Sequence, residues 1–96
     1  MKRLVLTEIA RADLASIRRY STRTWGQDQT NKYMDALRDT MKGLVRGTVV
    51  TRTRDDLRPA IQMATSGRHS IFFELNESRI VVVRVLHDSM DYVRHL

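Results

Sequence analysis

The sequence predicts an α+β domain of order β-α-α-β-β-β, in which a helical hairpin packs on one face of a small antiparallel sheet. Apolar residues recur at helical spacing in the first half of the chain and form short β-branched runs in the second half, with turn residues between the segments. Ninety-six residues suffice for one core but not for two, so we expect residues 1–96 to form a single domain.

The first helix of the hairpin is expected to follow a short strand at residues 3–7. Thr7 can cap this helix, because a threonine hydroxyl accepts hydrogen bonds from the first free N–H groups. Its apolar stripe is Ala10, Leu14 and Ile17. The helix should end where Gly26 can adopt a left-handed conformation, and we expect Trp25 to close the hairpin as part of the core.

The second helix is expected to run from about residue 28 to residue 46, with Gly47 as its stop signal. Its apolar stripe consists of Tyr33, Leu37, Met41 and Leu44. Two helices joined by so short a turn must lie antiparallel. The segment 47–58 mixes arginine with aspartate, and we predict that it is a loop.

Three strands are predicted after Pro59, at residues 61–65, at residues 70–75 and in the β-branched run that begins at Ile80. A near-continuous apolar run is typical of a central strand that is buried on both faces. Because side chains alternate along a strand, one face should be dry core, lined by Val81, Val83 and Val85. The other face should be an open groove, lined by Ile80, Val82, Arg84 and Leu86.

The charge of the chain predicts an acidic partner. Seventeen basic residues face eleven acidic ones, which gives a net charge of +6, and all but three of the basic residues are arginines. Arginine forms bidentate contacts with carboxylate and phosphate groups more readily than lysine does. The alternative is a basic surface without a partner.

The composition also sets the expected compartment. The chain has no cysteine, which excludes disulfide scaffolds, thiolate metal sites and cysteine nucleophiles. No apolar run approaches the roughly 20 residues that span a membrane, and the first residues do not resemble a secretory signal. We therefore expect a cytoplasmic protein without a membrane partner.

Four segments of the chain form a recognisable set. They are Ala12-Asp13-Leu14 with Ile17, Thr24-Trp25-Gly26, His69-Ser70-Ile71-Phe72-Phe73, and Arg84-Val85-Leu86-His87-x-x-Met90-Asp91-x-x-Arg94-His95-Leu96. This set resembles the ParE toxins of the RelE/ParE superfamily of bacterial toxin–antitoxin modules, and the carboxy-terminal segment is its most specific part.

The resemblance implies a toxin that inhibits DNA gyrase and forms a hetero-oligomer with a ParD-type antitoxin, whose disordered carboxy-terminal half wraps the toxin. It implies no catalytic residue, metal or cofactor, and no direct sequence-specific binding of nucleic acid. The residues predicted to contact the antitoxin or the target are Arg11, Arg18, Arg68, His69, Ile80, Val82, Arg84, Leu86, His87, Met90 and Tyr92.

Alternatives remain open at several of these positions. Arg84 could pair with Glu74 across the sheet, the two histidines could serve only the local structure, and the arginines of the first helix could be solvated. Trp25 could lie at an interface instead of in the core, and Met90 and Tyr92 could fold back over the groove instead of contacting a partner.

Two other functions are also compatible with the sequence. Histidine and arginine near the carboxy terminus could supply the acid, base and positive charge of a ribosome-dependent messenger-RNA endonuclease of the RelE branch. Two departures from the family pattern keep open a non-toxic antitoxin-binding module. Pro59 lies where relatives carry a Gly-Tyr-Arg-like step, and Phe73 stands where they usually have tyrosine.

Overall fold

A computed structural model describes residues 2–96 and confirms the predicted fold class. The elements in chain order are β1 (Arg3–Leu6), α1 (Glu8–Trp25), α2 (Gln27–Arg46), β2 (Arg52–Thr53), β3 (Gln62–Ser66), β4 (His69–Leu75), β5 (Arg79–His87) and α3 (Tyr92–His95). The strands form one sheet in the order β1-β5-β4-β3-β2, so the β-branched strand β5 is central, as predicted.

The sheet is mixed, whereas the sequence suggested an antiparallel one. β1 runs parallel to β5, with Leu4 opposite Ile80, and the other neighbouring strands are antiparallel. Between β1 and β5 the chain passes through the helical hairpin and three further strands, and strands that are not joined by a tight turn can run in the same direction. The two-residue strand β2 lies within the predicted loop 47–58 and forms one edge of the sheet.

The ends of the two long helices follow from local chemistry. The Thr7 hydroxyl accepts a hydrogen bond from the Ala10 N–H, which confirms the expected cap of α1. Gly47 ends α2 in the left-handed conformation, with φ 72°. Gly26 has φ 85° but an extended ψ of 172°, so it joins the two helices without continuing either.

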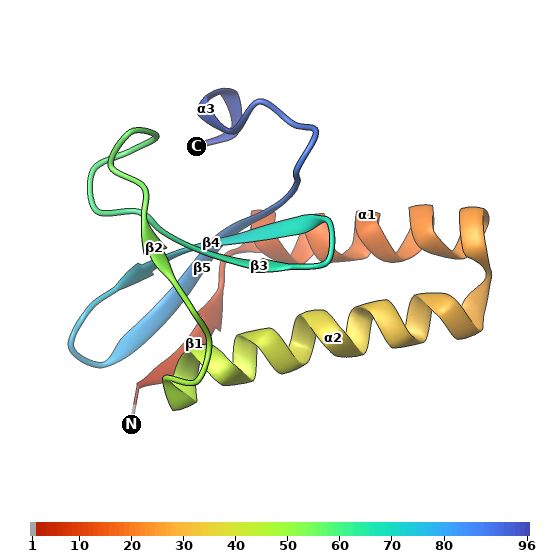
Figure 1. Cartoon of the computed structure of the whole chain (residues 1–96), viewed down its shortest axis with the longest axis horizontal. Coiled ribbons are helices and arrows are strands. Elements are labelled where there is room, and N and C mark those ends of the chain that lie inside the picture. Colours follow the sequence, from red (N-terminus) through yellow and green to blue (C-terminus); the bar gives the residue numbers. More distant parts are fainter. Residues whose placement is uncertain (1) are drawn as a thin grey trace.

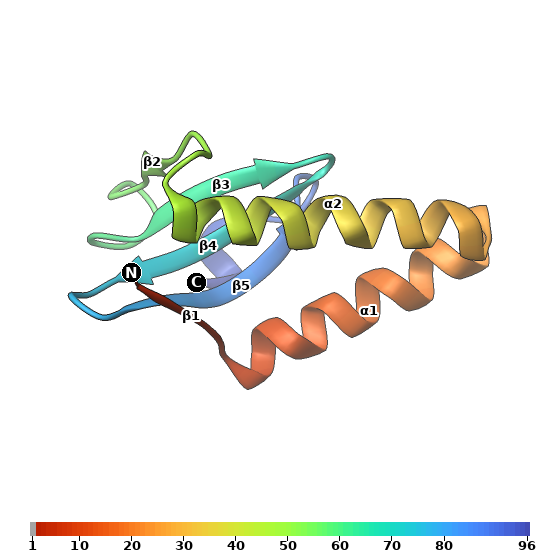
Figure 2. The same ribbon diagram turned by 90° about the horizontal axis from the view of Figure 1, so that it is seen from below.

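The two long helices lie on one face of the sheet, and the short helix α3 lies on the other. Figures 1 and 2 show α1 and α2 packed against one face, with their connecting turn projecting beyond the strands, while α3 lies on the other face. The core between the hairpin and the sheet includes Ala10, Ile17, Leu37, Met41, Leu44, Ala64, Ile71, Phe73, Ile80, Val82 and Val85. In the described part of the chain, no helix is both long enough and apolar enough to span a membrane.

The predicted assignment of β5 side chains to the two faces was wrong. Ile80 and Val82 are 2% and 0% exposed and pack beneath the helices, where we had expected an open groove. The side on which the helical hairpin packs decides which face of the strand is covered, and here it covers Ile80 and Val82. The register also shifts after Val82: Phe73 lies opposite Val82 and Phe72 opposite Arg84, so one residue of β5 has no partner in β4. Such a bulge changes the phase of the alternation. As a result, residues on both sides of the bulge face the helices.

The second face of the sheet is also closed. A smaller core, formed by Ile61, Met63, Phe72 and Leu86, lies there, and Leu57, Val83, Tyr92 and Leu96 pack against it. The chain's own carboxy-terminal segment therefore occupies the face that we had expected to be open. Leu86 is 1% exposed, so it cannot contact a partner in this conformation.

Candidate functional site

The main open concavity lies beside α1, where the helical hairpin extends past the ends of β4 and β5. This groove has a volume of about 420 Å³. The residues that line it are Asp13, Ser16, Ile17, Tyr20, Ser21, Trp25, Tyr33, Arg68, His69, Val85, His87, Ser89 and Met90. It brings together four of the residues predicted to contact a partner, namely Arg68, His69, His87 and Met90.

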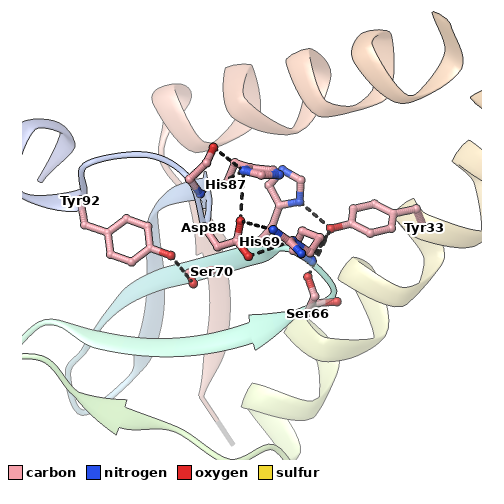
Figure 3. Close-up of polar contacts among 9 residues, drawn as sticks. Tyr33, Ser66, His69, Ser70, His87, Asp88 and Tyr92 are labelled. Atoms are coloured by element: carbon pink, nitrogen blue, oxygen red, sulfur yellow. Dashed lines mark hydrogen bonds and ion pairs between the residues drawn. The ribbon is translucent and has the colours of Figure 1, made fainter. Parts of the chain in front are cut away.

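Two histidines form the polar wall of the groove. His69 begins β4 and His87 ends β5, and the two residues are direct partners in the sheet register. Their rings are in edge-to-face contact, with centroids 5.1 Å apart. In Figure 3, Tyr33 from α2 and Tyr92 from the carboxy-terminal segment approach this pair of strand ends from opposite sides.

Tyr33 fixes the turn between β3 and β4. Its hydroxyl oxygen lies 2.5 Å from His69 Nδ1 and accepts the Arg68 backbone N–H at 3.0 Å. Gly67 in this turn has φ 57°, and a Cβ there would lie 2.7 Å from Tyr33 Cε1. Only glycine fits this position without moving the Tyr33 ring. Through the contacts of Tyr33, α2 holds the turn and positions His69.

His87 is held by the residues that follow it. The Ser89 backbone N–H donates to His87 Nδ1 at 3.0 Å, so the neutral ring carries its proton on Nε2. Asp88 Oδ1 lies 3.2 Å from the same nitrogen, and Asp88 also pairs with Arg68 at 2.9 Å. In both histidines the Nδ1 atom is thus engaged locally, and neither Nε2 has a hydrogen-bond partner within residues 2–96.

Burial lowers the pKa of His69 from its ordinary value of 6.5, because desolvation disfavours the charged ring. The charge of His87 lowers this pKa further, and Asp88 opposes the shift. His69 is therefore a neutral ring near neutral pH. The wall presents the uncharged ring of His69 beside His87 and an arginine that is already paired.

Arg84 lies behind the groove and joins three parts of the chain. Its Nε and Nη2 atoms donate to the Asp13 carboxylate at 2.8 and 2.9 Å, and Nη1 donates to the His95 carbonyl at 3.2 Å. Asp13 also accepts the Val85 backbone N–H at 2.9 Å. The hydrogen bonds that Arg84 donates to Asp13 raise the pKa of Arg84, and desolvation opposes this shift.

The alternative pairing of Arg84 with Glu74 was wrong, since Glu74 pairs with Arg58. Arg84 lies at the end of the sheet that α1 covers, and there the nearest carboxylate comes from the helix. The Ala12-Asp13-Leu14 motif contained this residue, but its spacing gave no sign that Asp13 faces β5.

Tyr92 covers the second core. Its ring packs edge to face on Phe72 at 4.9 Å, and its hydroxyl lies 3.1 Å from Ser70 Oγ. Tyr92 therefore belongs to the internal structure of the domain.

Aromatic rings form the outer rim of the groove. Trp25 is 61% exposed, so its prediction as a core residue was wrong. It projects from the hairpin beyond the sheet and contacts Tyr20 edge to face at 5.9 Å. Tyr20 is also more than half exposed, and the sequence analysis missed it, although four-residue spacing to Ser16 could have placed it on the groove side.

The arginines of α1 lie on its solvent side. Arg11 and Arg18 are exposed, seven residues apart on one stripe of the helix, and neither forms an ion pair with any residue from 2 to 96. Their charge is available to a partner. Over the same residues, no group of three or more histidine, aspartate or glutamate side chains is arranged to hold a metal ion.

Comparison with known protein families identifies the chain as a toxin of a type II toxin–antitoxin system. The family described as "ParE toxin of type II toxin-antitoxin system, parDE" matches residues 4–92. The chain belongs to this family.

Individual relatives agree with this assignment. The chain is 33% identical to Toxin ParE1 of Mycobacterium tuberculosis over 95 residues, which are 98% of this chain and 97% of that protein. It is 32% identical to Toxin ParE1 of Caulobacter vibrioides over 96 residues, covering 100% and 99% of the two chains. The fold matches a solved structure described as the chromosomal ParDE system from P. aeruginosa, with a TM-score of 0.78, 22% identity, and coverage of 91% and 96% of the two chains.

Proposed function

We propose that this ParE-type toxin inhibits DNA gyrase by binding to it, and that a ParD-type antitoxin neutralises the toxin in the cytoplasm. The observation that carries the proposal is the family match over residues 4–92, together with relatives named as ParE toxins that align along almost their whole length. The structure described as a ParDE system supports the antitoxin as the partner.

The antitoxin would bind along the solvent side of α1. The chain carries a net charge of +6, and the stripe of Arg11 and Arg18 presents two guanidinium groups that form no ion pair within residues 2–96. A flexible acidic segment can pair with such a stripe and fold as it binds. The second face of the sheet, which is filled by the chain's own tail, is not needed for this interaction.

Inhibition by binding, rather than by catalysis, is supported by the intramolecular contacts of the histidine and arginine side chains at the groove. Both histidines engage Nδ1 in local hydrogen bonds, Arg68 pairs with Asp88, and Arg84 pairs with Asp13. These contacts fix the turn and the strand end. The large hydrophobic side chains that remain exposed around the groove are Tyr20, Trp25 and Met90, residue types that are enriched in protein interfaces.

Two parallel assays test the proposal. Purified toxin is added to a gyrase supercoiling and DNA-cleavage assay, and separately to ribosomes translating a defined message. We expect loss of supercoiling, with the message intact, and restored supercoiling when the protein encoded by the adjoining reading frame is added. Message cleavage with unaffected gyrase would replace this proposal with an RNA endonuclease. Normal growth of bacteria that express the chain would favour a non-toxic module.

The arginine stripe has its own test. The double variant Arg11→Ala/Arg18→Ala should weaken antitoxin binding while leaving inhibition of gyrase intact. The double variant Arg46→Ala/Arg52→Ala is a charge-matched control, because both arginines are exposed and lie away from α1. Equal losses of affinity in the two double variants would refute the assignment of the stripe.

A further inference from the structure

The groove beside α1 has positive charge on both banks. On the α1 bank, Arg19 and Arg23 are one helical turn apart and are three residues from the lining residues Ser16 and Tyr20, respectively, so they occupy the rim. Both are exposed, and neither forms an ion pair within the described chain. On the opposite bank lies Arg68, whose side chain is 73% exposed even though it contacts Asp88. An anionic chain could therefore be held from two sides.

Between these banks, five of the thirteen residues that line the groove carry flat rings. Tyr20 and Trp25 form an exposed edge-to-face pair, and Tyr33 lies deeper beside His69. Nδ1 of His87 accepts the Ser89 N–H, so a neutral His87 ring carries its N–H at Nε2. Nδ1 of His69 is engaged by the Tyr33 hydroxyl, and neither Nε2 has a partner in the described chain. The groove thus combines ring faces for stacking with hydrogen-bond donors at its wall.

This combination fits a nucleotide. A volume of about 420 Å³ lies within the range of small-molecule sites. Proteins that bind single strands without reading their sequence use a basic groove for the backbone and aromatic rings for the bases. An acidic peptide would satisfy the arginines but would make no use of paired ring faces beside imidazole donors. Duplex DNA keeps its bases stacked and could not offer one to these rings.

We propose that this groove binds an unpaired nucleotide of a single-stranded nucleic acid, with its base stacked on Tyr20 beside Trp25 and its phosphates between the two arginine banks. This property goes beyond gyrase inhibition and needs no gyrase. A toxin that blocks gyrase but does not bind oligonucleotides would refute this inference alone.

The chain contains one tryptophan, and that residue is Trp25, so intrinsic fluorescence reports directly on the groove. We expect a ten-nucleotide oligothymidylate to quench this fluorescence in a saturable way, with an affinity that falls steeply as salt is raised. A duplex of the same length and a ten-residue polyglutamate should quench much less.

Variants are compared by the anisotropy of a labelled oligothymidylate, which does not depend on tryptophan. Tyr20→Ala should lower the affinity about tenfold, as expected for the loss of one stacking ring. Arg19→Ala/Arg23→Ala should lower the affinity and also flatten its salt dependence. The control Arg3→Ala/Arg52→Ala removes the same charge from exposed positions on the two edge strands of the sheet and should change the affinity much less.

Several outcomes would overturn the proposal. Absence of quenching at low salt would do so, as would equal loss of affinity in the two double-arginine variants. Tighter binding of polyglutamate than of oligothymidylate would identify the groove as a site for acidic protein segments. Equal binding of duplex and single strand would show that only the phosphate backbone is recognised. Circular dichroism of each variant separates unfolding from lost binding.

Discussion

Asp13 should be among the most sensitive polar positions of the domain. Its carboxylate accepts two hydrogen bonds from Arg84 and one from the Val85 N–H, and the side chains of Asp13 and Arg84 are 14% and 19% exposed. In the Asp13→Ala variant, a largely buried guanidinium loses its counter-charge and a strand N–H loses its acceptor. Breaking a buried pair from one side costs about 3–5 kcal/mol, which is a large part of the stability of a domain of this size.

Urea unfolding followed by circular dichroism measures this cost. In the Arg84→Met background the uncompensated charge is gone, so Asp13→Ala should cost at least about 1 kcal/mol less there than in the wild type. Asp35→Ala is the matched control, because it breaks a 2.9 Å pair with Arg38 whose side chains are about 60% exposed, and it should cost no more than about 0.5 kcal/mol. A cost below about 1 kcal/mol for Asp13→Ala in the wild type would refute the structural role of this pair.

Three further predictions concern the turn, the histidine wall and the tail. Gly67→Ala should destabilise the domain by at least about 1 kcal/mol more than Gly47→Ala in thermal unfolding, because both glycines have positive φ but only at Gly67 would a Cβ meet an aromatic ring; equal costs would contradict this. His69→Gln should reduce the loss of stability that occurs as the pH is lowered from about 7.5 to about 5.5. The pKa of His69 is lowered in the folded state, so the unfolded chain binds more protons in acid and the free energy of unfolding decreases as the pH falls. An unchanged pH dependence of the free energy of unfolding would contradict the second prediction. Tyr92→Ala should cost about 3 kcal/mol or more and Tyr92→Phe only about 1 kcal/mol, since the ring covers a buried phenylalanine while the hydroxyl makes one hydrogen bond; similar costs in denaturant unfolding would show that the ring does not seal the second core.

The elements were predictable because their signals are local. The hydroxyl of Thr7, the helical spacing of apolar residues and the glycine after α2 each act within a few residues, and the structure confirms them. The centrality of β5 was also predictable, because its apolar run leaves no solvent face.

What failed depends on contacts between distant segments. Whether Ile80 faces the helices depends on which side the hairpin packs, and a bulge in β5 then changes the alternation within the strand. The partner of Arg84 is Asp13, which lies 71 residues earlier in the chain. The apolar pattern of the carboxy-terminal segment was too weak to show that Tyr92 folds back on the sheet. No local signal showed that Trp25 is exposed beyond the end of the sheet.

We infer that the toxin acts through the groove on the α1 side of the domain and that its other sheet face is internal. Hydrogen–deuterium exchange of the toxin, alone and bound to gyrase, tests this most directly. We predict slower exchange in the bound state at residues 20–25 and at residues 87–90, with no change at residues 61–63 or 92–96. Protection confined to residues 61–63, or faster exchange of a displaced tail at residues 92–96 with α1 unchanged, would contradict the claim.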